Sequence, residues 1–267
     1  ANYAFTFVSG AITINAKGVV VTASSPTVTY GDAVPSITPS YGDFVNGQSS
    51  TVVSNTACTT VYVRTSNVGS LPATSCSGAT AANYSFTYTS GSVVIEKKTL
   101  TATASSHSVT YGDAKPTVTP SYDGFVNSQN ATALTTAPTC DTTYSTTSGF
   151  GTVASTCSGG VATNYSFSFT PGVISVAKKT LTVTASSHIV TYGDSAPSPT
   201  PSYDGWVNSQ GVGAITTAPT CTTAYTNTTA VASSGIATSC SGGIAANYAF
   251  TFVAGAITIN AKGVVVT

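Results

Sequence analysis

Residues 179–194 read KTLTVTASSHIVTYGD, and their first half alternates strictly between apolar residues and threonines. Leu181, Val183 and Ala185 would face one side of an extended backbone, while the threonines between them would face the other. This period of two, rich in β-branched residues, predicts a half-buried β-strand. The Tyr-Gly-Asp at the end predicts a loop, because glycine has unusual backbone freedom and aspartate bonds readily to nearby backbone groups.

The same motifs recur along the chain at a nearly constant interval. VTYGD occurs at residues 28–32, 109–113 and 190–194. The dipeptide Asn-Tyr begins at residues 2, 83, 164 and 247, so its spacings are 81, 81 and 83. Self-similarity at a fixed period is the signature of a repeat protein. We therefore divide the chain into repeat 1 (residues 18–98), repeat 2 (99–179) and repeat 3 (180–262).

The two ends of the chain resemble each other more closely than the internal copies do. Residues 1–22 and 246–267 differ only in having Ser9 in the first stretch and Ala254 in the second. Residues 1–17 correspond to the C-terminal hairpin of a preceding repeat, and residues 263–267 correspond to the first strand of a following repeat. We expect the chain to be a window on a longer array of such three-repeat groups.

The second half of each repeat carries another strand pattern. Residues 164–169, NYSFSF, alternate as well, and Thr170, Pro171 and Gly172 separate them from the apolar run VISV. A short turn with glycine between two such runs predicts a β-hairpin, in which the glycine would adopt a positive φ angle. No long stretch has helical periodicity. We therefore predict an all-β fold, in which each repeat is a small antiparallel domain, either a sandwich or a β-grasp-like sheet.

The connections between repeats are short. Only Ala177, Lys178 and Lys179 separate the last predicted strand of repeat 2 from the first strand of repeat 3. A linker of this length restricts hinge motion compared with a flexible linker rich in glycine and serine. We therefore expect a tandem array in which each repeat contacts mainly its neighbours and the whole forms an elongated rod.

Each repeat contains two cysteines. Their separations are 18, 17 and 19 residues, in the pairs Cys58 and Cys76, Cys140 and Cys157, and Cys221 and Cys240. Three disulfides within the repeats are the simplest pairing, although other connectivities are open. A zinc site is disfavoured, because zinc sites need closely spaced cysteines or clustered histidines. Disulfides persist in oxidising compartments, so we predict an extracellular protein, either at a cell surface or in a secreted fibre.

The composition limits the classes of partner. Charged residues make up 6% of the chain, against about 25% in ordinary soluble domains, and the formal net charge is zero. Binding to nucleic acid requires a basic face, and a membrane-spanning helix requires a long apolar run. The sequence has neither, so we expect neither nucleic-acid binding nor membrane insertion. A net charge near zero also favours association between chains.

Two features of the sequence are candidates for binding sites. The aspartate of the Tyr-Gly-Asp motif recurs in every repeat and could contribute to a Ca²⁺ site, but capping of the turn explains it better. Trp206 stands where repeats 1 and 2 have Phe44 and Phe125. A lone tryptophan could contact a carbohydrate, but its phenylalanine counterparts favour a core aromatic residue.

The motifs KTLTVTA, VTYGD, SYDGFVN, SGG and ANYxFxFxxGxIxI, in this order, resemble the MBG-type (mostly-β, YGX) repeats of large bacterial surface proteins. The related YDG-type repeats are also similar. The resemblance covers essentially the whole chain, three times over. It implies secreted or cell-wall-associated stalks and adhesins, in long arrays and without enzymatic activity. The chain departs from the family pattern in its cysteine pair per repeat and its scarcity of charge.

We therefore expect a structural extracellular repeat protein, a stalk or filament-forming segment of a bacterial surface protein, and not an enzyme. No nucleophile and base recur together, so no catalytic residue, metal or cofactor is expected. The expected partner is a second copy of the chain, through end-to-end or lateral self-assembly and strand complementation by residues 1–17. The alternative is an adhesin module that binds a host glycan or protein, with Trp206 as the candidate contact.

Overall fold

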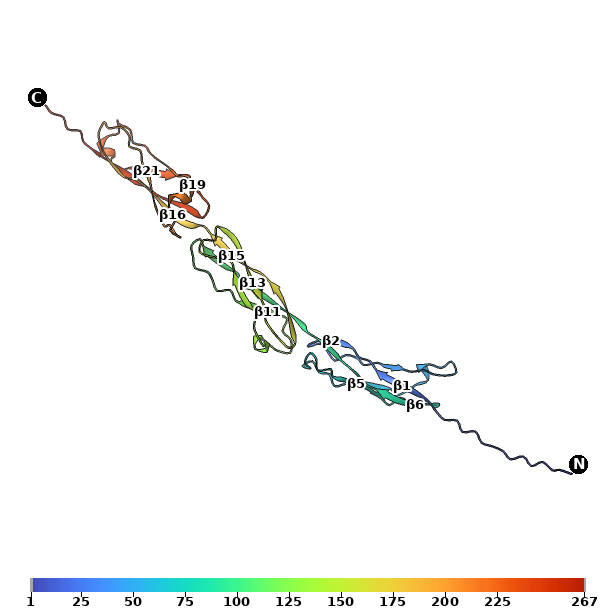
Figure 1. Cartoon of the computed structure of the whole chain (residues 1–267). Helices are drawn as coiled ribbons and strands as arrows, with labels where there is room; N and C mark the ends of the chain where they lie inside the picture. The colour runs from blue at the N-terminus through green and yellow to red at the C-terminus, as the bar shows by residue number, and fades with distance from the viewer. Residues whose placement is uncertain (1, 267) are drawn as a thin grey trace. The chain divides into compact units, whose positions relative to one another are not determined.

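The computed structural model describes residues 2–266, and Figure 1 shows its strands as arrows. Regular structure in this range consists of β-strands and four single-turn 3-10 helices, η1 (Ser50–Val52), η2 (Ala131–Ala133), η3 (Val212–Ala214) and η4 (Val231–Ser233). No helix within it is long and apolar enough to cross a membrane. The predicted all-β class and its three tandem repeats are confirmed.

Each repeat contains a three-stranded sheet around its first strand, which we call the first sheet. Its strand order is β3 (Pro39–Tyr41), β1 (Lys17–Ala23) and β6 (Tyr84–Thr89) in repeat 1. In repeat 2 the order is β11 (Pro120–Asp123), β9 (Lys98–Ala104) and β14 (Tyr165–Thr170). In repeat 3 it is β18 (Pro201–Asp204), β16 (Lys179–Ala185) and β23 (Tyr248–Val253).

A second sheet in each repeat carries the cysteines, and we call it the cysteine sheet. Its order is β10 (His107–Thr110), β15 (Gly172–Ala177), β13 (Gly151–Ser158) and β12 (Thr139–Thr142) in repeat 2. In repeat 3 it is β17 (His188–Thr191), β24 (Gly255–Asn260), β21 (Ile236–Ser241) and β20 (Thr220–Thr223). A small pair, β19 (Ile215–Thr217) and β22 (Ile244–Ala245), accompanies it in repeat 3.

The cysteine sheet of repeat 1 is divided in two. One part is the pair β2 (Thr27–Thr29) and β8 (Val94–Glu96), and the other contains β4 (Ala57–Thr60), β5 (Ala73–Ser77) and β7 (Gly91–Ser92). The division falls at Val93, because the strand that is continuous in the other repeats is interrupted there.

The sheets are mixed, whereas the sequence pattern led us to predict small antiparallel domains. In repeat 3, β16 pairs with β23 in parallel, with Lys179 opposite Tyr248, and β17 pairs with β24 in parallel. The partners β18 and β21 pair antiparallel to these strands, as predicted. Alternation has the same period in parallel and antiparallel strands, so the sequence could not reveal the direction of pairing.

The predicted hairpin at the end of each repeat is wrong. The strands β23 and β24 follow each other directly, yet they lie in different sheets and do not pair with each other. The chain therefore crosses from the first sheet to the cysteine sheet at Gly255, and it does the same at Gly91 and Gly172. The predicted role of the glycine was also wrong, since the φ angle of Gly255 is not positive.

The glycine is required because the crossing leaves no space for a side chain. A Cβ atom on Gly255 would overlap the carbonyl oxygen of Ala185 and lie 2.6 Å from the Thr238 hydroxyl. That hydroxyl is buried and donates a hydrogen bond to the carbonyl oxygen of Ser186 at 2.8 Å. The small residue thus lets a buried hydroxyl satisfy a carbonyl group at the point where β16 leaves the first sheet.

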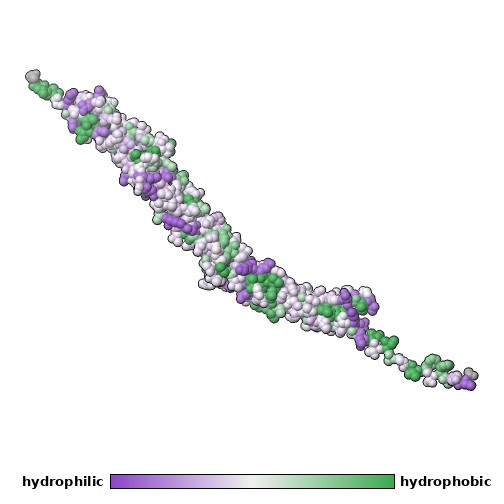
Figure 2. All heavy atoms as spheres, viewed as in Figure 1, coloured by the Kyte–Doolittle hydropathy of each residue, from purple (hydrophilic) through white to green (hydrophobic). Residues whose placement is uncertain are grey.

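The core of each repeat is narrow. The side chains of Leu181, Val183 and Ala185 in β16 are buried, as the alternation predicts, and the threonines between them are partly buried or exposed. Val183 and Ala185 pack against Cys240, so the disulfide itself forms part of the core. The surface is mostly of intermediate hydropathy, as Figure 2 shows, in keeping with the few charged residues.

The chain folds into two compact units. The first contains residues 2–101, 122–137 and 159–168, and the second contains residues 102–121, 138–158 and 169–266. Contacts of repeat 1 with repeat 2 therefore occur within the first unit, and contacts of repeat 2 with repeat 3 within the second.

The two ends of the described chain have no regular secondary structure. Residues 2–16 precede β1 without forming a strand, and residues 261–266 follow β24 in the same way. Residues 1 and 267, which belong to the predicted partial repeats, lie outside the described range.

We predict that Gly255→Ala destabilises repeat 3 by about 2 kcal/mol, because the added methyl group has no space at the crossing. Thermal unfolding followed by circular dichroism measures the effect. The matched control is Gly213→Ala, because no atom lies within 4 Å of a Cβ at that position. Equal melting temperatures for the two variants would contradict the role given to the crossing.

Candidate functional site

The six cysteines form one disulfide within each repeat, as their spacing predicts. Cys58 pairs with Cys76, Cys140 with Cys157, and Cys221 with Cys240. In every repeat the two cysteines lie directly opposite each other on neighbouring antiparallel strands, and the Cα atoms are 4.0 Å apart. Closing a loop of this length stabilises a fold by about 3 kcal/mol in the chain-entropy model. The disulfide is thus a major source of stability for so small a core.

The Tyr-Gly-Asp loop is held by local hydrogen bonds, which confirms the capping role predicted for its aspartate. Asp113 accepts a hydrogen bond from the Thr110 backbone at 2.7 Å through its carboxylate. Its backbone carbonyl oxygen accepts another from the Tyr144 hydroxyl at 2.9 Å. The same bonds form in the other two repeats. Among residues 2–266, no group of three or more His, Cys, Asp or Glu side chains lies together.

The tyrosine that fixes this loop has an altered acidity. Burial raises the pKa of Tyr144 above its ordinary value, and the negative charge of Asp113 raises it further. Tyr62 occupies the same place in repeat 1, and burial likewise raises its pKa. The protonated form of these two tyrosines is therefore favoured.

The loop of repeat 1 contacts repeat 2 within the first unit. The ring of Tyr30 meets the ring of Tyr165 edge to face, with centroids 5.6 Å apart. The next residue, Gly31, approaches Val126 so closely that a Cβ atom on it would lie 2.5 Å from a Val126 methyl group. The loop thus inserts into a site on the following repeat that accepts only a glycine beside the tyrosine.

Hydrogen bonds surround this apolar contact. Asn164 accepts a bond from the backbone N–H of Val68 at 2.9 Å. Asn127 donates one to the carbonyl oxygen of Arg64 at 3.0 Å. Lys97, in the linker, donates one from its ammonium group to the carbonyl oxygen of Ala162 at 2.9 Å. We call this set of contacts the junction between repeats.

The junction between repeats 2 and 3 repeats these contacts within the second unit. Tyr111 meets Tyr248 with centroids 5.6 Å apart, and a Cβ atom on Gly112 would lie 2.6 Å from Val207. The three hydrogen bonds recur, from Phe150 to Asn247 at 2.9 Å, from Asn208 to Thr146 at 2.7 Å and from Lys178 to Ala245 at 2.9 Å.

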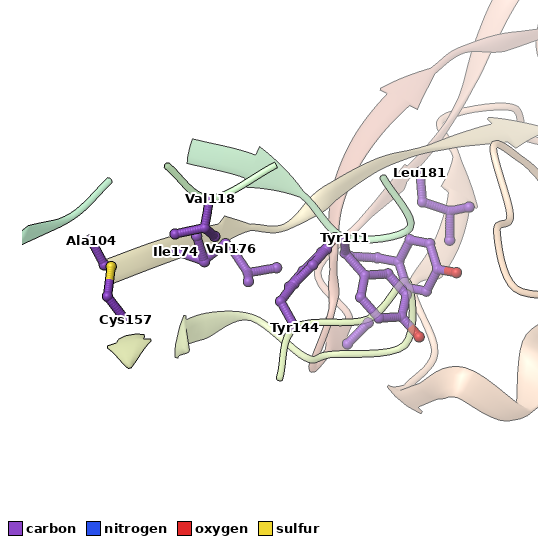
Figure 3. Close-up of a cluster of buried hydrophobic side chains, with 10 residues drawn as sticks. Ala104, Tyr111, Val118, Tyr144, Cys157, Ile174, Val176 and Leu181 are labelled. Carbon is purple, nitrogen blue, oxygen red and sulfur yellow. The ribbon is translucent and has the colours of Figure 1, made fainter. Parts of the chain in front are cut away.

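The buried core is continuous through this second junction. One cluster joins residues of repeat 2 with residues of repeat 3, namely Ala104, Tyr111, Val118, Tyr144, Cys157, Ile174 and Val176 with Leu181, Ala245 and Tyr248. In Figure 3 the cluster extends in space from Ala104 and Cys157 at one end, past Tyr111 and Tyr144, to Leu181 at the other. Repeats 2 and 3 therefore share one packed core.

Sequence analysis missed most residues of the junction. It treated Lys178 only as part of a short linker, whereas Lys97 and Lys178 each donate a hydrogen bond across a junction. The recurring Tyr-Gly was interpreted only as a turn. Its contact with the next repeat also requires glycine, because a Cβ atom on Gly31 would overlap Val126. The recurrence of Val-Asn after an aromatic residue, alongside Asn-Tyr, in every repeat is the signal that could have indicated a shared partner surface.

Trp206 lies among aromatic residues of its own repeat. Its ring meets Tyr248 edge to face at 5.0 Å between centroids and lies 5.8 Å from Tyr203. Phe125 makes the equivalent contact with Tyr165 at 5.3 Å in repeat 2. The tryptophan is half-buried, so part of its ring reaches the surface.

The repeats match a known family. The model described as MBG domain (YGX type) matches residues 19–94, 100–175 and 181–258, one match for each repeat. No curated protein matches the chain.

We predict that Tyr144→Phe reduces the loss of thermal stability as the pH rises above about 10. The pKa of a tyrosine in the unfolded chain is about 10, whereas the pKa of Tyr144 in the folded chain is higher. The stability due to this difference is complete below the unfolded pKa and is lost as the pH rises through the folded pKa. Melting temperatures measured against pH test this, with the exposed Tyr3→Phe as control. Identical alkaline profiles for Tyr144→Phe and the unsubstituted protein would contradict it.

Proposed function

Because the chain belongs to the MBG family of the YGX type, whose model matches all three repeats, we propose that it is a structural module of an extracellular surface protein. The three disulfides and the MBG repeats are consistent with an extracellular location. The proposed role is that of a stalk or filament-forming segment in a bacterial surface protein. It includes no enzymatic activity and no cofactor.

The junction is the observation that carries the proposal. The same aromatic contact, the same glycine approach and the same three hydrogen bonds form between repeats 1 and 2 and between repeats 2 and 3. A contact set reproduced at successive junctions is what a tandem array built from nearest-neighbour contacts requires. This supports a segment built of stacked repeats.

The disulfides add resistance to extension. Each one closes a loop of 17 to 19 residues, so these residues cannot lengthen when a repeat is pulled apart. Cross-strand disulfides also restrict the conformations open to the unfolded chain. Both properties suit a segment that holds another domain away from a cell surface.

The proposed partner is a second copy of the chain, through end-to-end or lateral association. The zero formal net charge means that long-range repulsion does not oppose such contacts. Neither nucleic acid nor membrane insertion is part of the proposal.

The alternative function is an adhesin module that binds a host glycan or protein. It rests on Trp206, the single tryptophan of the chain, whose ring is partly exposed. Trp206 packs on Tyr248 as Phe125 packs on Tyr165, and this equivalence supports the structural role instead.

We predict that reduction lengthens the unfolded chain in single-molecule force spectroscopy. Release of a loop of 17 to 19 residues adds about 60 Å of extended chain per repeat, at about 3.4 Å per residue. The double variant Cys221→Ala and Cys240→Ala serves as the matched control. It has no disulfide in repeat 3, so unfolding of this repeat should give the longer contour-length increment without reductant. Increments that do not change on reduction would contradict the mechanical role of the disulfides.

We predict no selective signal on a glycan array for the chain. The variants Trp206→Phe and Trp206→Ala separate packing from recognition, since phenylalanine occupies this position in repeats 1 and 2. Binding that is lost in both variants, while thermal stability is retained in Trp206→Phe, would favour the adhesin function over the structural one.

A further inference from the structure

The disulfide of repeat 1 borders an open cleft. The cleft has a volume of 440 Å³ and lies between β4 and the loop that leads from β2 to β3, so that its lining includes Val34, Pro35, Ile37 and Cys58. Cys58 is partly exposed beside this cleft, whereas its partner Cys76 is only 6% exposed. Solvent therefore reaches the disulfide from the side of Cys58.

The position of Cys58 in its sheet sets the direction of approach. The strand β4 is an edge strand, with β5 on one side only, and Cys58 lies directly opposite Cys76 of β5. The sulfur–sulfur bond therefore runs from the edge of the sheet toward its interior. Beyond Cys58 this direction leaves the sheet on the side of the cleft. At the other end of the bond, Cys76 packs in a buried cluster with Val21 and Ala23.

Thiol–disulfide exchange depends on this geometry. A thiolate attacks one sulfur from the side opposite the other sulfur, because the electron pair of the old bond leaves along the same line. At Cys58 that side is the cleft, whereas at Cys76 the core occupies it. Attack on the folded repeat is therefore open at Cys58 and blocked at Cys76.

Repeat 2 closes the same place with an ion pair. Lys115 is the counterpart of Val34 in the loop before β11. Asp141 is the counterpart of Thr59 in the edge strand β12, and its carboxylate lies 2.7 Å from the ammonium group of Lys115. The ion pair thus joins the loop to the edge strand beside Cys140, across the gap that remains open in repeat 1.

The opening of the cleft is a property of repeat 1 itself. All residues that line it lie between Val34 and Thr60. Repeat 2 has a neighbouring repeat on both sides, and yet the side chains of Lys115 and Asp141 are 44% and 77% exposed at the equivalent place. A neighbouring repeat therefore does not cover this face.

The lining of the cleft determines which thiols it accepts. It contains no charged residue and combines apolar side chains with hydroxyl groups, namely those of Val34, Pro35 and Ile37 with those of Ser36, Thr59 and Thr60. A charged compound would lose hydration in the cleft without gaining an ion pair. A small uncharged thiol such as 2-mercaptoethanol, with a short carbon skeleton and a hydroxyl group, matches the lining.

We propose that Cys58 is a site of thiol–disulfide exchange with small uncharged thiols, and that the ion pair of repeat 2 protects Cys140 from the same reaction. The thiolate sulfur of the small thiol forms a bond to Cys58 as the bond between Cys58 and Cys76 breaks. The electron pair of that bond leaves on the Cys76 sulfur, which takes a proton from water. The products are a mixed disulfide at Cys58 and a free thiol at Cys76.

The exchange frees repeat 1 from its disulfide and leaves repeat 2 closed. The bond between Cys58 and Cys76 joins residues 18 apart in the chain, and its opening frees the residues between them to extend. The reaction is stoichiometric. It goes beyond the proposed structural role, since it gives the chain a site for covalent attachment of a thiol compound.

The test is to treat the folded chain with 2-mercaptoethanol at about pH 8, where part of the reagent is ionised, for a series of times. Free thiols are then alkylated with iodoacetamide, and peptide mass spectrometry locates the modified cysteines. We expect the mixed disulfide on Cys58 and the alkyl group on Cys76. We also expect the bond between Cys140 and Cys157 to react about tenfold more slowly, because access to it is restricted.

Two double variants exchange the residues that differ between the repeats. Val34→Lys with Thr59→Asp transfers the ion pair to repeat 1 and should slow its reaction to the rate of repeat 2. Lys115→Val with Asp141→Thr removes the ion pair from repeat 2 and should accelerate its reaction about tenfold. All four side chains are exposed, so the fold should tolerate both variants, and thermal unfolding checks this.

Equal rates in repeats 1 and 2, or rates that the double variants leave unchanged, would overturn the proposal. So would a mixed disulfide on Cys76 in place of Cys58. Low concentrations of urea distinguish the route, because direct attack on a folded repeat changes little with urea, whereas attack after unfolding accelerates steeply. Steep acceleration in repeat 1 would therefore also contradict the proposal. None of these outcomes alters the structural role, since force spectroscopy of the oxidised chain measures it separately.

Discussion

The arrangement of the repeats depends on linkers of a single residue. Only Lys97 lies between β8 and β9, and only Lys178 lies between β15 and β16. One residue spans at most about 3.6 Å, so the last strand of a repeat ends where the first strand of the next repeat begins. The first backbone N–H of the new strand is bonded at once, from Lys98 to Asn164 and from Lys179 to Asn247. This proximity brings the Tyr-Gly loop of one repeat against the next repeat, where its tyrosine ring packs on a second tyrosine.

Within a repeat, the crossing at glycine has a comparable effect. In repeat 3, β16 and β23 pair in parallel in the first sheet, and the strands that follow them, β17 and β24, pair in parallel in the cysteine sheet. Both segments thus pass from one sheet to the other. The buried hydroxyls of Thr74, Ser155 and Thr238 bond to the carbonyl oxygens freed at the three crossings, each at 2.8 Å. Threonine and serine thus substitute for part of the hydrophobic core. The disulfide compensates for the remainder, since so little apolar surface is available for burial.

The sequence predicted those features that depend on local pattern. The alternation in KTLTVTA correctly located a strand and its buried face, and the cysteine spacing correctly indicated pairs within repeats. Strand direction and the crossing at Gly255 were not predictable, because period and turn residues look the same for a hairpin and for a change of sheet. The junction was missed for a different reason. Its residues, such as Gly31 and Val126, are about one repeat apart in sequence, and each has an adequate local explanation.

Repetition creates a risk of mispairing, and the core residues of the crossing strands limit that risk. At the first buried position after the glycine, the three repeats have Val93, Ile174 and Ile257, and all are fully buried. Two residues later they have Ile95, Val176 and Ile259. A strand from the wrong repeat would leave or demand one methylene group at one or both positions, at a cost of about 1 kcal/mol each. Residues 2–16 have Ile12 and Ile14 at these positions, the same pair as repeat 3, whereas repeats 1 and 2 each match at only one position. The differences at these two buried positions thus favour the pairing of each crossing strand within its own repeat.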